Sequence, residues 1–220
     1  MNTPANAPPD ALLLLTSRCP HCPTVLQGLA ELVKQGLIGR LEAVNIEARP
    51  DIARQYGVRS VPWFRIGDFE LEGLHSPAEL RQWAQRAATP AGIGEYYTEL
   101  FKSGQLAKAL SSVHRNPHHL EALLELMADP DTELTVRIGI SAVMEDLAGS
   151  EALRAQLPTL LALATHDDPR VRADTSHFLA LTRSRAALEA LKKLAQDPER
   201  AVSNLARDSL EELEQQLNGS

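Results

Sequence analysis

The first ninety residues combine short apolar runs with one helical repeat of apolar positions, which predicts a small α/β domain. Four runs have the length and composition of strands: 11–16, 40–46, 63–66 and 69–72. The first is apolar over almost its whole length, as in a strand buried on both faces. Over 20–35, apolar residues recur at helical spacing: Val25, Leu26, Leu29, Leu32 and Val33. A right-handed strand–helix–strand crossover is expected here.

Turn and cap residues divide the rest of this domain. A short helix over 51–56 is closed by Gly57, and Gly67-Asp68 separates the last two strands in the manner of a hairpin. Ser76-Pro77-Ala78-Glu79 is an N-cap residue followed by proline and glutamate, which predicts a helix to about Ala88. Residues 11–88 are therefore expected to form one domain, a central mixed sheet flanked by helices.

The pattern changes at 89–94, where Thr89-Pro90-Ala91-Gly92-Ile93-Gly94 has the composition of a linker. Residues 95–217 then show helical periodicity only. Residues 1–10, rich in proline, alanine and asparagine, are expected to be a disordered lead. The helices expected in the second domain lie at about 95–103, 105–115, 117–128, 132–148, 151–165, 169–182, 184–196 and 198–217.

The second domain also shows an internal repeat. Asp-Pro at 129, 168 and 197 is followed each time by a valine, and these valines, Val136, Val171 and Val202, recur at intervals of 35 and 31 residues. Such a period is typical of helical solenoids, in which aspartate caps a helix that proline opens. The segment resembles HEAT repeats, and this resemblance implies an all-α solenoid that presents a surface for protein binding.

Length and charge limit the classes of function. A chain of 220 residues is long enough for two domains, each with its own core. Residues 1–90 carry nine basic and nine acidic residues, whereas residues 91–220 carry thirteen basic and twenty acidic ones, a net charge of −7. This acidic second half argues against nucleic acid and anionic membrane as partners.

The start of the chain does not match a targeting signal. Residues 1–10 contain no lysine or arginine, and the apolar run that follows is too short for a signal peptide. No stretch reaches the roughly 18 apolar residues of a membrane span. The protein is therefore expected in the cytoplasm, where a lone cysteine pair is more often catalytic than structural.

The only two cysteines, Cys19 and Cys22, lie two residues apart between the first strand and the first helix. A Cys-x-x-Cys at this place is typical of a thiol–disulfide redox site. The first cysteine is expected at the helix start, where free backbone amides and the helix dipole favour a thiolate. The spacing lets Cys22 attack a mixed disulfide on Cys19. Pro20 and Pro23 are tolerated because first-turn amides have no helical acceptor.

Two motifs in this order resemble the thioredoxin superfamily. Cys19-Pro20-His21-Cys22 stands at the redox position and Gly57-Val58-Arg59-Ser60-Val61-Pro62 at the cis-proline loop, and the resemblance covers about 40% of the chain. The additional Pro23 is more similar to the glutaredoxin-related branch, which includes protein disulfide oxidoreductases and the amino-terminal domain of flavin-containing alkyl hydroperoxide reductases.

The resemblance implies a role for each matching residue. Cys19 would be the nucleophile, Cys22 the resolving thiol and Pro62 a cis residue that faces them. Val61 would offer its backbone groups to an extended substrate, a form of strand addition.

The chain departs from ordinary thioredoxins at two positions. Leu13 replaces the buried aspartate six residues before the nucleophile, so the usual proton relay for the resolving thiol is missing. Arg18 replaces the tryptophan that precedes the nucleophile. With His21, Arg18 is expected to lower the pKa of Cys19 and to raise the reduction potential above that of a general thioredoxin.

Other residue groups have alternative interpretations. The cysteine pair could be structural or half of a zinc site with His21, although a full site needs four ligands. His114, His118 and His119 could add ligands, but a solvated turn is the preferred interpretation, and His166 and His177 are expected at the surface or between helices. Glu42 and Glu47 could replace the proton relay or simply be solvated. Tyr96, Tyr97 and Phe101 could dock the first helix on the redox domain or bind a partner.

The sequence therefore predicts a thioredoxin-like thiol–disulfide oxidoreductase, acting on a protein substrate or redox partner and fused to a HEAT-like interaction domain. No metal and no cofactor are expected. The alternative is a redox-switched, chaperone-like or adaptor protein in which partner binding by the solenoid is the primary activity. A third possibility, electron transfer to a peroxidase or flavoprotein, rests on the Cys-x-x-Cys-Pro resemblance alone.

Overall fold

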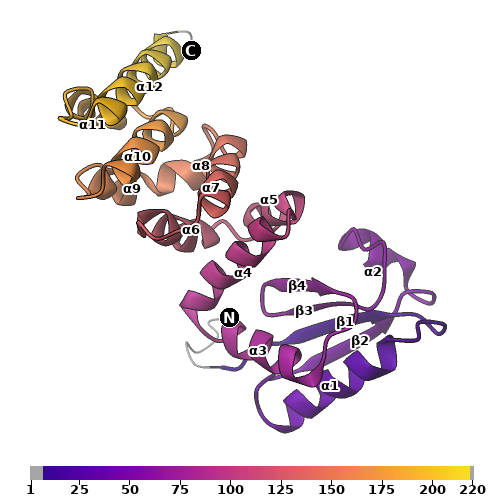
Figure 1. The fold of residues 1–220 in the computed structure, drawn as a ribbon. Helices are drawn as coiled ribbons and strands as arrows, with labels where there is room; N and C mark the ends of the chain where they lie inside the picture. Colours follow the sequence, from indigo (N-terminus) through magenta and orange to yellow (C-terminus); the bar gives the residue numbers. More distant parts are fainter. Residues whose placement is uncertain (1–6, 219–220) are drawn as a thin grey trace. The chain divides into compact units, whose positions relative to one another are not determined.

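The computed structural model describes residues 7–218, and the chain forms two compact units divided between Tyr96 and Tyr97 (Figure 1). The first unit is a mixed sheet flanked by helices and the second is helical. The predicted fold class, α/β followed by all-α, is therefore confirmed. Among the described residues, no helix is both long and apolar enough to span a membrane.

Four strands form one sheet in the order β2-β1-β3-β4. β1 (Ala11–Leu15) pairs in parallel with β2 (Leu41–Asn45) and antiparallel with β3 (Trp63–Ile66). β3 continues through a tight turn into antiparallel β4 (Phe69–Glu72). β1 is thus an inner strand, which explains its apolar run, and the predicted strands are confirmed.

Side chains of β1 alternate between two apolar layers. Leu12 and Leu14 form a cluster with Trp63, against which Ile52 and Tyr56 from the segment of α2 (Pro50–Gln55) pack. By alternation, Leu13 points to the other face, which α1 (Cys22–Lys34) and α3 (Pro77–Ala87) cover (Figure 1). The inner strand β1 is therefore buried on both faces.

Individual residues set the packing of α1 on α3 and the start of α3. A Cβ added at Gly28 of α1 would lie 2.5 Å from Leu80 of α3, so glycine allows the two helices to approach closely. Ser76 and Glu79 form the predicted capping box, in which the Glu79 carboxylate accepts from the Ser76 N–H at 2.7 Å and the Ser76 hydroxyl accepts from the Glu79 N–H at 3.3 Å. The predicted start of α3 is confirmed.

The predicted disordered lead lies partly outside the described residues, since residues 1–6 are not described. Residues 7–10 have no regular secondary structure, but they are tied to the first unit. The carbonyl of Pro9 accepts from the Gly39 N–H at 2.9 Å, and that of Asp10 accepts from the Gly67 N–H at 2.8 Å. These bonds fix the entry into β1.

The segment expected as a linker, 89–94, is helical from Pro90 onward, because proline opens α4 (Pro90–Lys102). Gly92 and Gly94 are buried within this helix. A Cβ at Gly92 would collide with the backbone of Arg86, so the glycines allow close packing. Composition alone could not distinguish this use of glycine from flexibility.

The aromatic residues of α4 are internal. Tyr96 is 1% exposed and stacks on Phe69 with ring centroids 4.7 Å apart, within the first unit. Tyr97 and Phe101 are 0% and 5% exposed, and their rings are 6.0 Å apart within the second unit. Burial of all three side chains excludes the partner-binding alternative for them in this structure. Tyr96 makes the expected docking contact with the first unit, through its stack on Phe69.

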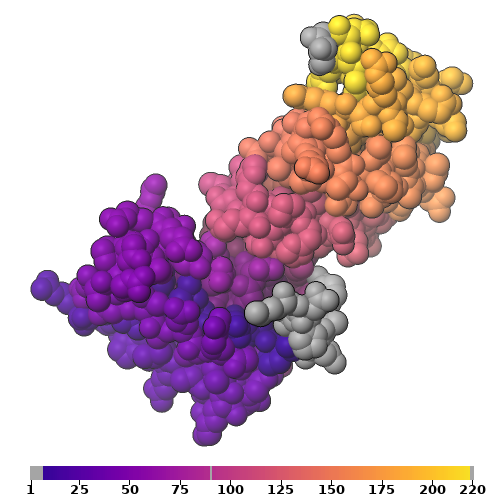
Figure 2. All heavy atoms as spheres, turned by 180° about the vertical axis from the view of Figure 1, so that it is seen from behind, coloured from indigo at the N-terminus to yellow at the C-terminus, as the bar shows by residue number. Residues whose placement is uncertain are grey.

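The second unit runs from the end of α4 through successive helices, which follow one another as bands of colour in Figure 2. Two predicted helices are each interrupted. Residues 151–165 form two short helices because Pro158 lacks an N–H and would clash with a preceding carbonyl. Residues 184–196 begin with a 3₁₀ turn. The elements are α5 (Leu106–Arg115), α6 (His119–Ala128), α7 (Leu134–Asp146), α8 (Glu151–Ala155), α9 (Leu157–Leu163), α10 (Pro169–Leu181), η1 (Arg185–Ala187), α11 (Leu188–Leu194) and α12 (Arg200–Asn218).

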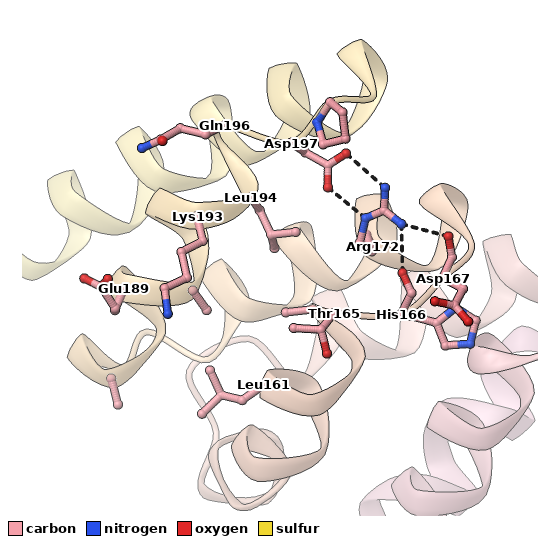
Figure 3. A pocket seen from close by; sticks show the side chains of 14 residues that line it. Leu161, Thr165, His166, Asp167, Arg172, Glu189, Lys193, Leu194, Gln196 and Asp197 are labelled. Atoms are coloured by element: carbon pink, nitrogen blue, oxygen red, sulfur yellow. Dashed lines mark hydrogen bonds and ion pairs between the residues drawn. The ribbon is translucent and has the colours of Figure 1, made fainter.

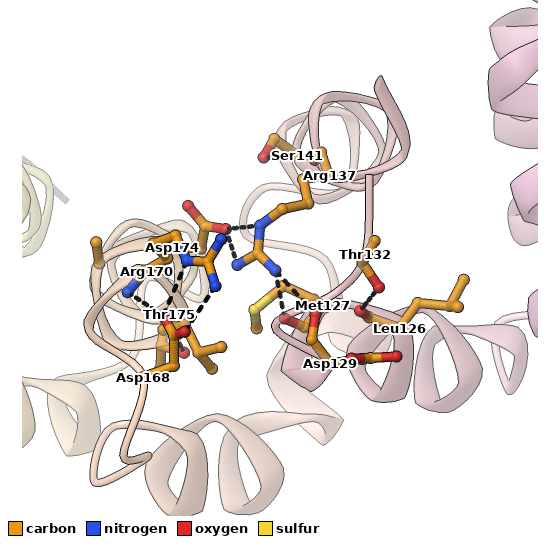
Figure 4. A network of polar contacts seen from close by, with 12 residues as sticks. Leu126, Met127, Asp129, Thr132, Arg137, Ser141, Asp168, Arg170, Asp174 and Thr175 are labelled. Atoms are coloured by element: carbon orange, nitrogen blue, oxygen red, sulfur yellow. Dashed lines mark hydrogen bonds and ion pairs between the residues drawn. The ribbon is translucent and has the colours of Figure 1, made fainter. Parts of the chain in front are cut away.

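The repeat noticed in the sequence corresponds to packed helices. α10 contacts both α7 and α12, and the recurring valines Val136, Val171 and Val202 are 2%, 0% and 0% exposed. The arginine after each of the first two valines bridges segments. Arg137 donates to the Asp174 carboxylate of α10 at 2.6 and 3.1 Å and to the Met127 carbonyl at 2.9 Å (Figure 4). The repeated positions therefore hold neighbouring helices together.

Candidate redox site

The loop between β1 and α1 carries a disulfide between Cys19 and Cys22, with Cα atoms 5.5 Å apart. Cys22 is the first residue of α1 and is 3% exposed, whereas Cys19 lies before the helix and is partly exposed. The Cys22 N–H donates to Cys19 Sγ at 3.1 Å. Cys19 Sγ therefore accepts a hydrogen bond from one of the first-turn N–H groups, which have no acceptor within the helix.

The side chains around the pair are exposed. Arg18, Pro20 and His21 are all on the surface. Cys19 is therefore partly open to solvent, while Cys22 is shielded by the body of the unit. The two cysteines thus differ in their accessibility.

The register of the sheet brings two further segments to the end of β1 that carries this loop. Asn45 pairs with Leu15 in parallel β2, and Trp63 pairs with Leu14 in antiparallel β3. The segment after β2 and the segment before β3 therefore lie at the same end of the sheet as Cys19.

The segment before β3 contains the Val61–Pro62 peptide bond, which is cis. Pro62 is buried and Val61 is partly exposed. The Pro62 carbonyl accepts from the Gly73 N–H at 2.8 Å, and the Ser60 hydroxyl donates to the Glu72 carboxylate at 3.2 Å. Two hydrogen bonds therefore tie this loop to the end of β4.

The segment after β2 holds the loop that precedes Cys19. The Glu47 carboxylate accepts from the Ser17 N–H at 3.0 Å, and the Asn45 side-chain amide donates to the Ser17 hydroxyl at 3.1 Å. The sequence did not predict these contacts. The available signal was an asparagine at a strand end, a position where its side chain often bonds to the backbone two residues on. Here Asn45 Oδ1 does so, accepting from the Glu47 N–H at 2.9 Å.

The two glutamates considered as proton relays lie in different places. Glu42 is exposed and pairs with Leu12, toward the far end of β1. Glu47 lies beside the loop that precedes Cys19. Its pKa is lowered mainly by the hydrogen bond from the Ser17 N–H, and further by the Ser17 side chain and the positive charge of Arg18. A carboxyl group that remains ionised is poorly suited to hold a proton for Cys22. Leu13, at the usual relay position, is 0% exposed and apolar.

The histidines considered as metal ligands have partners within the protein. His114 Nε2 lies 2.6 Å from the Asp146 carboxylate. His177, which is expected at the surface or between helices and not as a ligand, has its Nε2 3.2 Å from the Glu145 carboxylate on α7. His119 was expected in a solvated turn and is instead 0% exposed, with Nδ1 2.9 Å from the Tyr97 hydroxyl. The solvated-turn prediction is wrong for His119 because its helix turns it into the core.

His166 lies in the turn before α10 and so between helices, one of the two places expected for it. It is partly exposed, and its Nδ1 accepts from the Asp168 N–H at 3.0 Å. It also borders a groove of about 730 Å³ between the α9–α10 turn and α11 (Figure 3). The lining mixes apolar residues such as Leu161 and Leu194 with polar ones such as Lys193. Clefts of this volume can hold a small ligand or a peptide segment.

A second, smaller groove of about 270 Å³ lies along α7, facing α10. Leu134 and Ile138, which stand one turn apart on α7, line it and are 72% and 60% exposed. The Arg137–Asp174 pair also lines it. Large apolar side chains exposed together in a groove are typical of protein-interaction surfaces.

Comparison with known proteins agrees with this description of the first unit. The family model described as Thioredoxin domain matches residues 11–85, about a third of the chain. A search of curated proteins finds no match. The match covers all four strands and the Cys19–Cys22 pair. Residues 11–85 therefore form a thioredoxin-like domain with its cysteine pair joined as a disulfide.

Proposed function

We propose that the protein is a thiol–disulfide oxidoreductase that uses the Cys19–Cys22 couple on a protein substrate. One observation carries the proposal: within a thioredoxin-like domain, the two sulfurs are bonded, Cys19 is partly exposed and Cys22 is buried. The exposed Cys19 sulfur can react with a substrate disulfide. The buried Cys22 cannot react with that substrate directly, but it can attack the mixed disulfide on Cys19 and release the product.

In the reducing direction, the Cys19 thiolate attacks one sulfur of a substrate disulfide. A mixed disulfide forms, and the other substrate sulfur leaves as a thiolate that takes up a proton. The Cys22 thiolate then attacks Cys19 Sγ, which forms the Cys19–Cys22 bond and releases the second substrate thiol. Two electrons pass from the protein to the substrate. The reverse sequence oxidises a substrate dithiol.

The surroundings of Cys19 support a stabilised thiolate. Its sulfur accepts the Cys22 N–H at the start of α1, where the helix dipole also favours negative charge. Arg18 and His21 flank it in sequence, and Arg18 is permanently positive. A stabilised thiolate makes the disulfide more oxidising, so we expect a potential above that of a general thioredoxin. The cis Pro62 and the backbone of Val61 are the proposed platform for an extended substrate.

The helical unit is the proposed protein-interaction scaffold of a cytoplasmic enzyme, and its repeated Asp-Pro turns and valines resemble HEAT repeats. The groove on α7 supports this role, because Leu134 and Ile138 expose apolar surface that a partner would cover. The same exposed pair favours a second candidate, a chaperone-like or adaptor protein in which partner binding is primary and the cysteine pair is a switch.

A trapping experiment tests the oxidoreductase proposal. Reduced Cys22→Ser protein, mixed with a protein that has an accessible disulfide, should accumulate a mixed disulfide through Cys19, because the resolving thiol is gone. Cys19→Ser is the matched control and should trap far less, because only the buried position keeps a sulfur. Equal trapping by both variants, or by neither, would contradict the assignment. If a variant that carries both Cys19→Ser and Cys22→Ser protects a client protein from aggregation as well as the wild-type protein does, binding is the primary activity.

A further inference from the structure

The contacts around Ser17 connect the end of β2 to the residues immediately before Cys19. Ser17 is held at two atoms: its N–H by the Glu47 carboxylate at 3.0 Å and its hydroxyl by the Asn45 amide at 3.1 Å. We call Asn45 and Glu47, which hold Ser17, the clamp. It is connected to the sheet, because the Ile46 N–H between them donates to the Leu15 carbonyl at 3.0 Å. The start of the loop is therefore held by hydrogen bonds at Leu15 and at Ser17.

Glu47 also contributes a charge at this place. Its carboxyl pKa is lowered, first by the Ser17 backbone bond and in part by Arg18, so it is ionised at neutral pH. Arg18 is the positive residue next to Cys19 in the chain, and part of its field is therefore opposed by Glu47. Glu47 lies on the surface, so solvent screens its field without removing it.

We propose that Glu47 is a positioning residue of the redox couple, holding the loop before Cys19 and setting the reduction potential through its charge. This inference rests on the proposed function of Cys19 and Cys22. Glu47 touches no reacting atom in the structure. It acts through Ser17, which it bonds, and through Arg18, which it partly neutralises.

The direction of the effect follows from the charges of the two redox states. Reduction adds two electrons to the disulfide and yields a dithiol whose Cys19 is partly thiolate. A negative Glu47 disfavours that thiolate, so it holds the potential down and the Cys19 pKa up. Replacing the carboxylate by a neutral amide should therefore stabilise the reduced protein and make the couple more oxidising.

The size of the effect is modest because both groups face water. Two unit charges about 10 Å apart in water change an equilibrium by a factor of about two. A twofold change in the exchange equilibrium with glutathione corresponds to about 9 mV for a two-electron couple. Quantitative alkylation of reduced and oxidised protein resolves such a shift when variants are equilibrated side by side.

The test compares Glu47→Gln with Glu42→Gln in the full chain. Both remove one exposed carboxylate from the β2 region, but Glu42 pairs with Leu12 at the far end of β1. Each protein is equilibrated in glutathione buffers, and the rate of Cys19 alkylation is followed against pH. We expect Glu47→Gln to shift the equilibrium about twofold toward the dithiol and to lower the Cys19 pKa, with Glu42→Gln unchanged.

An unchanged or opposite shift in Glu47→Gln, or an equal shift in Glu42→Gln, overturns the inference. A second variant separates charge from loop position. Asn45→Ala removes the bonds to the Ser17 hydroxyl and to the Glu47 N–H but keeps the Glu47 charge, so it should leave the Cys19 pKa closer to wild type than Glu47→Gln does. The proposed function fails independently: a wild-type protein that reduces no protein disulfide refutes it, whereas the potential shift can still be measured.

Discussion

Arg172 makes an ion pair that joins separate segments of the helical unit, and its loss offers a quantitative test of how that unit is held together. Its guanidinium donates to both carboxylate oxygens of Asp197, at 2.7 and 3.0 Å. It also donates to the carbonyls of His166 and Asp167 at 2.8 and 2.9 Å (Figure 3). One side chain therefore joins α10, the turn before it and the turn before α12.

The free-energy cost of Arg172→Ala follows from burial. The two side chains are only 14% and 7% exposed, so the substitution removes both guanidinium bonds from a largely buried Asp197 carboxylate, which keeps the Glu199 N–H as a donor. Breaking such a pair costs about 3 kcal/mol, the lower end of the range for fully buried pairs. Arg170 is the matched control, two residues away on the same helix. Its pair with Asp168 is local, and its side chain is 64% exposed, so Arg170→Ala should cost less than about 1 kcal/mol.

Urea unfolding at pH 7, followed by the helical circular dichroism signal, measures both losses of stability. We expect Arg172→Ala to lose about 2 kcal/mol more than Arg170→Ala. Asp197→Asn should fall between them, because it keeps a hydrogen-bond acceptor for Arg172. Equal losses in the two arginine variants would refute the reasoning that burial and the contacts across elements, rather than the presence of an ion pair, decide stability.

Two further predictions concern the cap of α3 and the exposed stripe of α7. Hydrogen bonds from Ser76 lower the pKa of Glu79 in the folded protein. The contribution of the Glu79 carboxylate to the free energy of unfolding is therefore complete above the unfolded-state pKa of about 4.3, and it is lost as the pH falls through the pKa of the folded state. Urea unfolding between pH 6 and pH 3 should therefore show a smaller acid loss for Glu79→Gln than for wild type, and an identical loss would contradict the capping account. Leu134→Ser with Ile138→Ser should change stability by less than about 1 kcal/mol, because both side chains are largely exposed, yet reduce binding of partners and of a hydrophobic dye. Unchanged binding would contradict the proposal that the groove on α7 binds a partner.

The first unit could be predicted from the sequence because its signals are local and strong. The short apolar run of β1 favours a buried strand by its length, and the two cysteines shortly after it indicate one site for chemistry. The clamp by Glu47 could not be predicted, because it joins residues thirty positions apart in a register that only the folded sheet defines. Sequence patterns identify which residues belong to an element more readily than which side chains meet.

The second unit was predicted less completely for a similar reason. The sequence places Gly92 in a linker, but in the structure it lies in α4, where it allows the helix to pack against the Arg86 backbone. His119 appeared to belong to a turn, but it faces Tyr97 in the core. Glycine, proline and histidine each have several structural uses, and only the packing around them decides between these.

The reduction potential of the Cys19–Cys22 couple in the full chain decides whether the pair is a working redox site. We expect reversible two-electron exchange with glutathione and a potential above about −270 mV, the value of a general thioredoxin. A structural disulfide would instead resist reduction, with a potential below about −300 mV. That result would contradict the proposal that Cys19 and Cys22 are a working redox pair.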